Sequence, residues 1–224
     1  MINNENYYQF PAVSNSTLSW LKGLEEPEEI LFDKQMAYDD GNLVDAIITE
    51  PERVNLWQRK VQGIDRIYSQ EKINMAMNMQ KAFYQDEFCK NMVKHCNMQH
   101  ISYNPNYIIP YCNFTFELSV KCKWDLFCKG MDMGGDIKST FATTYNQFVD
   151  ACHYFDYFRS RAWYMDIENR THDVIIGISK KNYQIFKIYI NKGDELYKLG
   201  VEQYKALAYK YFYLFGDLNK FKII

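Results

Sequence analysis

The sequence predicts an α/β (α+β) fold, in which a central mixed β-sheet is flanked by helices. Apolar residues recur at helical spacing early and late in the chain, whereas the middle alternates apolar and polar residues as strands do. The 224 residues are 47% apolar and 24% charged, which excludes a disordered tail, a collagen-like repeat and a disulfide-stapled miniprotein. We expect one domain over residues 1–224, with a mainly helical part at 1–98, a sheet core at 99–192 and a C-terminal helix at 193–224.

The first part is expected to be helical from Ser16 to about Cys96. Ser14 and Ser16 supply hydroxyls that suit a helix N-cap, and Leu18 and Leu21 follow at helical spacing. A simple N-cap role would by itself explain the occurrence of serine at both positions.

From residue 100 to residue 140 the spacing of the apolar residues changes to two, which indicates strands. The alternating residues are Phe114, Phe116, Leu118, Val120, Cys122, Trp124 and Leu126. The elements expected after them are helices at about 143–155 and 157–167, strands at 173–180 and 183–190, and a helix at about 194–214. This order places the sheet in the middle of the fold.

The formal net charge is −2, from 26 Lys and Arg against 28 Asp and Glu, which taken alone argues against a nucleic acid as partner. The charge is unevenly distributed, however. Residues 1–60 hold eleven acids and five bases (−6), whereas residues 170–224 hold ten bases and five acids (+5). A bound divalent ion would add positive charge, so the near-neutral total does not exclude a locally positive surface.

A cytoplasmic protein without a membrane span is expected. Residues 1–10 show no secretory signal, and no apolar run approaches the roughly 20 residues that cross a bilayer. The six cysteines form no CxxC pair and have no histidine at metal-ligand spacing. Reduced thiols are the preferred interpretation, with disulfides or a zinc site as alternatives.

Charged residues gather on one face of the strand expected around residues 114–126. Because residues two apart on a strand share a face, Glu117, Lys121, Lys123 and Asp125 lie opposite the apolar residues of the same strand. The shared face with Asp125 favours a role for the two lysines along a phosphate backbone. Ordinary solvent-facing lysines are the alternative.

The next expected strand, 132–138, ends in Asp136-Ile137-Lys138. Two carboxylates on neighbouring strands, with a lysine two residues after the second, are what a divalent-metal phosphodiesterase requires. The carboxylates bind Mg²⁺, the ion polarises the phosphate, and the lysine positions or helps to deprotonate the attacking water. The two glycines before Asp136 would let a phosphate backbone approach the strand. An exposed charged face of the sheet is the alternative interpretation.

Five segments between residues 7 and 166 carry motifs in a recognisable order. They are Val13-Ser14-Asn15-Ser16-Thr17-Leu18 (S-x-S-x-L), Gly41-Asn42-Leu43-Val44-Asp45 (G-x-x-x-H/E), Lys121-Cys122-Lys123-Trp124-Asp125, Gly135-Asp136-Ile137-Lys138-Ser139-Thr140 (D-x-K-[ST]-[ST]) and Ala162-Trp163-Tyr164-Met165-Asp166 (the end of Q-A-x-x-Y). Together they resemble the PD-(D/E)XK nuclease superfamily, and within it the phage-recombination exonucleases of the exonuclease VIII and lambda exonuclease type. The resemblance implies a restriction-endonuclease-like core with a helical N-terminal part.

The resemblance also implies roles for single residues. The implied catalytic residues are Asp45, Asp125, Asp136 and Lys138. The implied ligands of Mg²⁺, or of Mn²⁺ in its place, are Asp45, Asp125, Asp136, the Ile137 carbonyl and Glu117. The implied DNA-binding residues are Ser14, Ser16, Lys121, Lys123, Thr140, Arg159 and Arg161, the two serines as helix-start hydroxyls that bind a terminal phosphate.

Two positions depart from the family pattern. Asp45 stands where exonuclease VIII relatives carry histidine, although lambda-type members carry a carboxylate there. Ser160 stands where the family has glutamine, so Arg159 or Arg161 is expected to take over its contact with DNA.

The implied function is a Mg²⁺-dependent DNA exonuclease. It would hydrolyse phosphodiester bonds from a duplex end in the 5′→3′ direction, giving single strands for recombination or repair in a bacterial or phage-infected cell. The resemblance further implies a homo-oligomeric ring, a trimer or tetramer, and a single-strand annealing protein as partner. No iron–sulfur cluster is expected, since no cysteine follows Cys152. The alternatives are a catalytically inactive DNA-binding or assembly protein derived from a nuclease, and a structure-specific endonuclease of the same superfamily.

Overall fold

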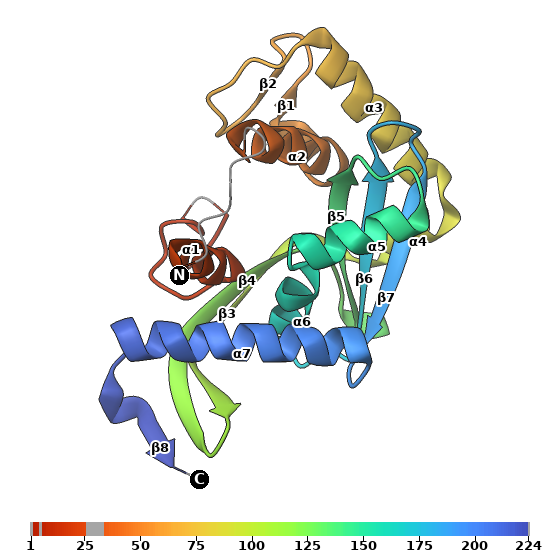
Figure 1. Ribbon diagram of the computed structural model, residues 1–224. Helices are drawn as coiled ribbons and strands as arrows, with labels where there is room; N and C mark the ends of the chain where they lie inside the picture. Colours follow the sequence, from red (N-terminus) through yellow and green to blue (C-terminus); the bar gives the residue numbers. More distant parts are fainter. Residues whose placement is uncertain (1, 5, 26–33, 224) are drawn as a thin grey trace.

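The computed structural model describes residues 2–4, 6–25 and 34–223 (Figure 1). The helices are α1 (Asn15–Glu25), α2 (Lys34–Thr49), α3 (Gln70–Gln85), α4 (Glu87–His95), α5 (Tyr145–Tyr154), α6 (Tyr157–Ile167) and α7 (Glu195–Phe215). The strands are β1 (Val54–Asn55), β2 (Lys60–Val61), β3 (Asn97–Tyr111), β4 (Phe114–Cys128), β5 (Met133–Thr140), β6 (His172–Ser179), β7 (Ile185–Asn191) and β8 (Phe221–Ile223).

The described residues form a mixed sheet in the order β3-β4-β5-β6-β7, with β8 beside β4. Strands β5 and β6 are parallel and are joined through α5 and α6, whereas the other neighbouring pairs are antiparallel. A parallel pair needs such a crossover connection. The predicted α/β architecture, a mixed sheet with helices around it, is therefore confirmed.

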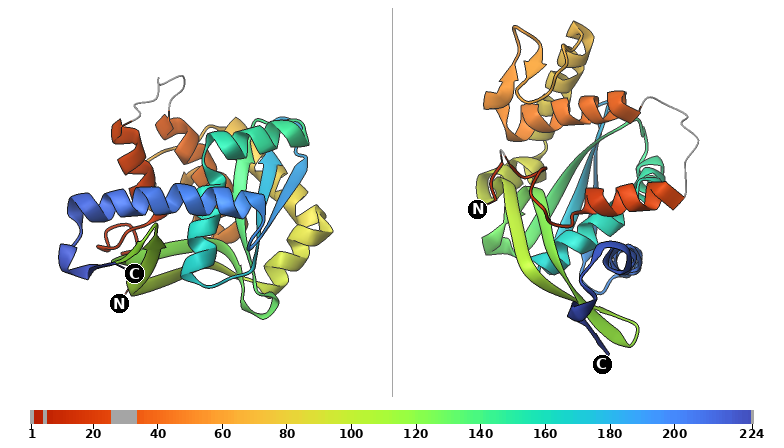
Figure 2. Two further views of the ribbon diagram at one scale, coloured as in Figure 1. Left: turned by 60° about the horizontal axis from the view of Figure 1, so that its bottom comes forward. Right: turned by 90° about the vertical axis from the view of Figure 1, so that its left-hand side faces the viewer.

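Helices cover both faces of the sheet (Figures 1 and 2). One core joins buried residues of α1, α5, α6 and α7 to β4, and the other joins residues of α2, α3 and α4 to β5 and β6. Strand β6 contributes to both cores, because Ile175 packs on one side and Ile176 on the other. A parallel strand buried on both faces reads as a continuous apolar run, as Val174–Ile178 does.

The period-two pattern of β4 does what the sequence predicts. Its apolar positions from Phe116 to Leu126 are buried, those up to Trp124 in the core with α1, α5, α6 and α7, and Leu126 in the other core. The two segments expected to be helices after the sheet begins, and the two expected strands after them, form α5, α6, β6 and β7 within a few residues of the expected bounds.

Two parts of the chain differ from the expectation. The helix expected at about 194–214 forms α7, but it does not fill the segment 193–224: it ends at Phe215, because Gly216, Asp217 and Asn219 favour a turn. The short strand β8 then pairs with the start of β4. The mainly helical N-terminal part also contains a small hairpin, β1–β2, and its residues 26–33 lie outside the described residues.

The two glycines before Asp136 are explained by packing within the sheet, not by an approaching phosphate. A Cβ on Gly134 would lie 1.9 Å from the Trp124 ring, and one on Gly135 would lie 3.3 Å from Leu126 Cβ. A Cβ has little space at either position because large side chains of β4 lie over β5. The expected phosphate role of these glycines is therefore wrong.

Gly134→Ala is expected to lower the free energy of unfolding by about 1–3 kcal/mol, the usual cost of overpacking a core. Gly130→Ala is the matched control, because nothing lies within 4 Å of its Cβ position. Urea unfolding followed by circular dichroism measures both. Equal stability of the two variants would contradict the packing account.

No described helix is both long and apolar enough to cross a lipid bilayer.

Candidate active site

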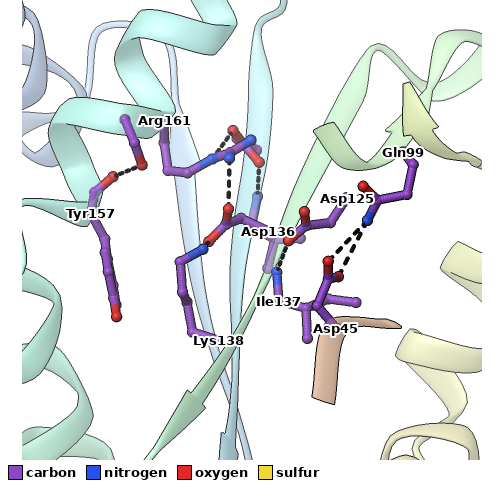
Figure 3. A network of polar contacts seen from close by, with 11 residues as sticks. Asp45, Gln99, Asp125, Asp136, Ile137, Lys138, Tyr157 and Arg161 are labelled. Carbon is purple, nitrogen blue, oxygen red and sulfur yellow. Dashed lines mark hydrogen bonds and ion pairs between the residues drawn. The ribbon is translucent and has the colours of Figure 1, made fainter. Parts of the chain in front are cut away.

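Three polar residues form a row across β3, β4 and β5. Met98 pairs with Leu126 and His100 with Trp124, which leaves Gln99 opposite Asp125. Leu126 pairs with Gly135, so one step further along the same antiparallel register brings Asp125 opposite Asp136. The sheet geometry therefore gathers side chains from positions 99, 125 and 136 (Figure 3).

The sheet is irregular at this row. Gln99 has a positive φ of 53°, and Trp124 and Leu126 belong to different cores although they are two residues apart on β4. On the β5 side, the Ile137 N–H donates a hydrogen bond to Asp125 Oδ2 at 2.7 Å. A side chain thus takes the place of a carbonyl in the ladder, which fixes the Asp125 carboxylate between the two strands.

Asp125 is crowded by other carboxylates. Burial, and after it the charges of Asp45 and Asp136, raise the pKa of Asp125 well above its usual range. Lys138 and the Ile137 N–H act in the opposite direction. Negative charge at Asp125 is therefore costly until a cation compensates it.

Asp136 lies between two cations. Its Oδ2 is 2.6 Å from Lys138 Nζ, and its Oδ1 accepts a hydrogen bond from Arg161 Nη1 at 3.0 Å. Burial alone would lower the pKa of Lys138, but Asp136 and Asp125 outweigh it and raise that pKa above its usual value. Lys138 is consequently an ammonium group at neutral pH, pointing at the carboxylates.

Asp45 reaches the same place from α2, near the end of that helix. Gln99 Nε2 donates to its carboxylate oxygens at 3.3 and 3.2 Å, and Thr49 Oγ1 donates to Oδ1 at 3.2 Å. Burial raises the pKa of Asp45, and the Lys138 charge lowers it. The helix motif therefore does deliver an acid to the neighbourhood of Asp125, held there by two donors.

These oxygens fit a magnesium ion better than a metal enclosed by the protein alone. Within residues 2–4, 6–25 and 34–223, no three His, Cys, Asp or Glu side chains are close enough together to enclose a metal ion. Mg²⁺ usually keeps several of its waters and takes only one or two carboxylates. Asp125 and Asp136 could supply carboxylate oxygens of this kind, and Mn²⁺ accepts the same oxygen donors.

Arg161 is not available to DNA, contrary to the expectation. It is 0% exposed, and its Nε donates to Asp173 Oδ2 at 2.8 Å while Nη1 donates to Asp136. Its guanidinium carbon lies 4.8 and 4.6 Å from the centroids of the Trp124 and Tyr164 rings, which also contact each other edge to face. Arg161 therefore holds Asp136 from inside the core.

Arg159 and Lys121 are likewise buried by contacts within the chain. Arg159 donates to Ser19 Oγ, Asn15 Oδ1 and Asp156 Oδ2, and so joins α6 to α1. Lys121 Nζ donates to the carbonyls of Tyr7 and Phe10, at 2.5 and 2.8 Å, and burial lowers its pKa. Both were expected to contact DNA, and both instead fasten the N-terminal segment to the rest of the fold.

Glu117 does not reach the site. It lies eight residues before Asp125 on the extended strand β4, or roughly 26 Å at the usual rise per residue. Its Oε1 is 2.6 Å from Lys220 Nζ, next to β8. The expectation that Glu117 binds a metal ion together with Asp125 is wrong.

Of the other expected DNA-binding residues, Lys123 has a mostly buried side chain and Thr140 is buried. Lys123 Nζ is 3.9 Å from Glu50 Oε2, beside the end of α2. Thr140 ends β5, and its Oγ1 accepts the Ala142 N–H.

Ser14 and Thr17 form a reciprocal cap at the start of α1, since Thr17 N–H donates to Ser14 Oγ and Ser14 N–H donates to Thr17 Oγ1. Ser16 is exposed, and its hydroxyl lies 2.8 Å from that of Ser14. Both serines line a cavity of about 380 Å³ that is also lined by Tyr8. Burial, and after it the charges of Asp45 and Asp125, raise the pKa of Tyr8, whereas Asp45, Asp125 and Asp136 do not themselves line this cavity.

Sequence reasoning missed the residues that hold the acids in place: Gln99, Thr49 and Asp173. A signal was present for one of them. Asp173 directly precedes the apolar run of β6, and Arg161 interrupts the apolar residues of α6, so two opposite charges inside core elements make a buried pair one of the interpretations to weigh. Gln99 carries no comparable signal, because its role depends on the register of β3 with β4.

The chain therefore has a mixed α/β fold of a kind known from a solved nuclease-like protein. A candidate exonuclease from Eubacterium rectale is 16% identical in sequence and superposes with a TM-score of 0.60, over 94% of this chain and 85% of that one. At this identity the likeness concerns the fold alone. A phage-related exonuclease from Haemophilus somnus 129PT, at 11% identity, reaches a TM-score of only 0.41 over 93% of this chain and 96% of its own. No protein-family model and no curated protein matches the sequence.

Proposed function

We propose that the protein is a Mg²⁺-dependent nuclease that hydrolyses phosphodiester bonds of DNA. The observation that carries the proposal is the meeting of Asp125, Asp136 and Lys138 on neighbouring strands, with Asp45 beside them. Two carboxylates, with an ammonium group two residues after the second, are the groups that metal-assisted phosphate hydrolysis needs.

Each residue has a separate task in this proposal. Asp125 and Asp136 would hold the ion, which supplies Lewis-acid polarisation of the phosphate and of a bound water. Lys138, as an ammonium group, attracts the phosphate and stabilises the negative charge that develops on it. Asp45, held by Gln99 and Thr49, adds negative potential that favours the ion.

We further propose that the enzyme is an exonuclease acting from a duplex end in the 5′→3′ direction, for recombination or repair in the cytoplasm. The fold likeness to a candidate exonuclease, and the cavity that Ser14 and Ser16 line at the start of α1, support an end-binding site. A ring of identical subunits and a single-strand annealing partner belong to the same proposal.

The test is cleavage of linear duplex DNA, labelled at either the 5′ or the 3′ end, in Mg²⁺ and in EDTA. The wild type is expected to release nucleotides only with Mg²⁺, and Asp136→Asn and Lys138→Ala are each expected to lose at least about a hundredfold in rate. Lys187→Ala is the control, since Lys187 pairs with Asp86 away from the site. Absence of cleavage by the wild type refutes the proposal, and cleavage of closed circular DNA would replace the exonuclease with an endonuclease.

A further inference from the structure

The hairpin β1–β2 presents a large aromatic side chain to solvent. Its tip, the four residues from Leu56 to Arg59, joins strands of two residues each. Trp57 is 89% exposed and Leu56 is 46% exposed. An indole that is left almost wholly in water costs free energy, so such a side chain invites an explanation by binding.

The tip is held in one conformation by main-chain contacts. The Gln58 N–H donates to Asn55 Oδ1 at 2.8 Å, and the Tyr68 N–H donates to the Arg59 carbonyl at 2.9 Å. Arg59 itself has a positive φ of 57°. The exposure of Trp57 therefore follows from a defined turn.

Two cations beside Trp57 lack partners. Arg59 and Lys60 make no side-chain hydrogen bond or ion pair among the described residues, whereas the neighbouring Arg53 pairs with Glu50 at 2.5 Å. An exposed aromatic ring next to free cations is the combination that binds single-stranded nucleic acid, because every base offers a face for stacking and every nucleotide a phosphate.

The hairpin is a direct continuation of the helix that carries Asp45. Helix α2 ends at Thr49, and Glu50 then lies within ion-pair distance of both Arg53 and Lys123 of β4. Trp57 follows Arg53 by four residues, so the Cα atoms of these two residues lie within about 14 Å of each other. Figures 1 and 2 show β1 and β2 projecting beyond α2, away from β6 and β7.

We propose that the β1–β2 tip binds an unpaired strand of the nucleic-acid substrate, with Trp57 stacked on a base and Arg59 and Lys60 at the adjacent phosphates. The proposal rests on the proposed function for the identity of the ligand. One indole and one leucine offer far less area than a stable subunit interface buries, and the free cations favour an anionic partner over a second copy of the chain.

The test is binding of a fluorescent single-stranded 20-mer in EDTA, followed by anisotropy. Trp57→Ala is expected to weaken binding roughly 5- to 150-fold, the range for loss of one stacked base, and Trp57→Phe is expected to retain part of it. Trp20→Ala is the matched control: Trp20 is 53% exposed on α1 and should change the affinity less than twofold. Arg59→Ala with Lys60→Ala should reduce the slope of log K against log salt by about 1.4.

Fluorescence gives a second readout. In a Trp20→Phe background, the emission of Trp57 should be quenched on binding, because the two other tryptophans, Trp124 and Trp163, are buried. Unchanged affinity of Trp57→Ala, or a change in its sedimentation mass instead of its DNA affinity, would overturn the proposal. Neither measurement needs cleavage, so a protein that binds through Trp57 but releases no nucleotides in Mg²⁺ would refute the nuclease proposal and leave this one standing.

Discussion

Arg161→Met is expected to lower the free energy of unfolding by about 3–5 kcal/mol at neutral pH. The arginine is fully buried, and it is the cation that contacts both Asp136 and Asp173. Burial raises the pKa of Asp173 to about 6 in spite of Arg161, so this carboxylate is ionised at pH 7 and would be left without its partner. Guanidinium unfolding in EDTA measures the effect.

A second substitution separates charge from packing. Asp173→Asn added to Arg161→Met is expected to recover a large part of the lost stability, because it removes the uncompensated charge. Arg170→Met is the matched control: Arg170 pairs with the half-exposed Asp132, and its loss should cost no more than about 1 kcal/mol. If Arg161→Met and Arg170→Met lost equal amounts of stability, this would contradict the interpretation that Arg161 compensates two buried carboxylates.

The stability of Arg161→Met should also depend on pH differently from the stability of the wild type. Without Arg161, the pKa of Asp173 rises further, so the folded state binds protons that the unfolded state does not bind. Stability then falls as pH rises from the unfolded pKa of about 3.9 through the folded value. The difference between wild type and Arg161→Met is therefore expected to shrink as pH is lowered from 8 to 5.

Arg161 also marks where reasoning from the sequence stops. The sequence shows the charge of Arg161 and its position in a helix, but it does not show in which direction the side chain points. A positive charge near a phosphate-binding motif indicates DNA as readily as it indicates a buried acid. Only the packing of α6 against the sheet, which places the guanidinium against the Trp124 and Tyr164 rings, decides between them.

The sheet was more predictable than the site, because alternation along one strand is a local property. The pattern from Phe116 to Trp124 is sufficient to predict β4 and the face that packs in one core, whereas Leu126 belongs to the other core. The position of Glu117 shows the limit: sharing a face with Asp125 says nothing about distance along the strand, and the length of β4 separates the two. Residues that share a face meet only when neighbouring strands bring them together, as Asp125 and Asp136 do.

Asp125→Asn is expected to remove the response of the protein to Mg²⁺. If the ion binds the folded state alone, a concentration of a hundred times Kd adds about 2.7 kcal/mol of stability. For a chain of this size that corresponds to a rise of roughly 5–10 °C in Tm. The wild type should show this rise in a thermal scan and Asp125→Asn should not, because an amide cannot supply the negative charge that the ion requires.

In EDTA, where no Mg²⁺ stabilises the wild type, Asp125→Asn is expected to be more stable than the wild type at pH 8. Burial and the neighbouring acids raise the pKa of Asp125, so the wild type loses stability as pH rises through that value, while the amide resembles the protonated acid. The advantage should vanish below about pH 3, where Asp125 is protonated in both the folded and the unfolded wild type. Glu117→Gln is the control and should respond to Mg²⁺ like the wild type, since Glu117 pairs with Lys220 instead. A Mg²⁺ response that is lost in Glu117→Gln, or kept in Asp125→Asn, would place the ion elsewhere in the protein.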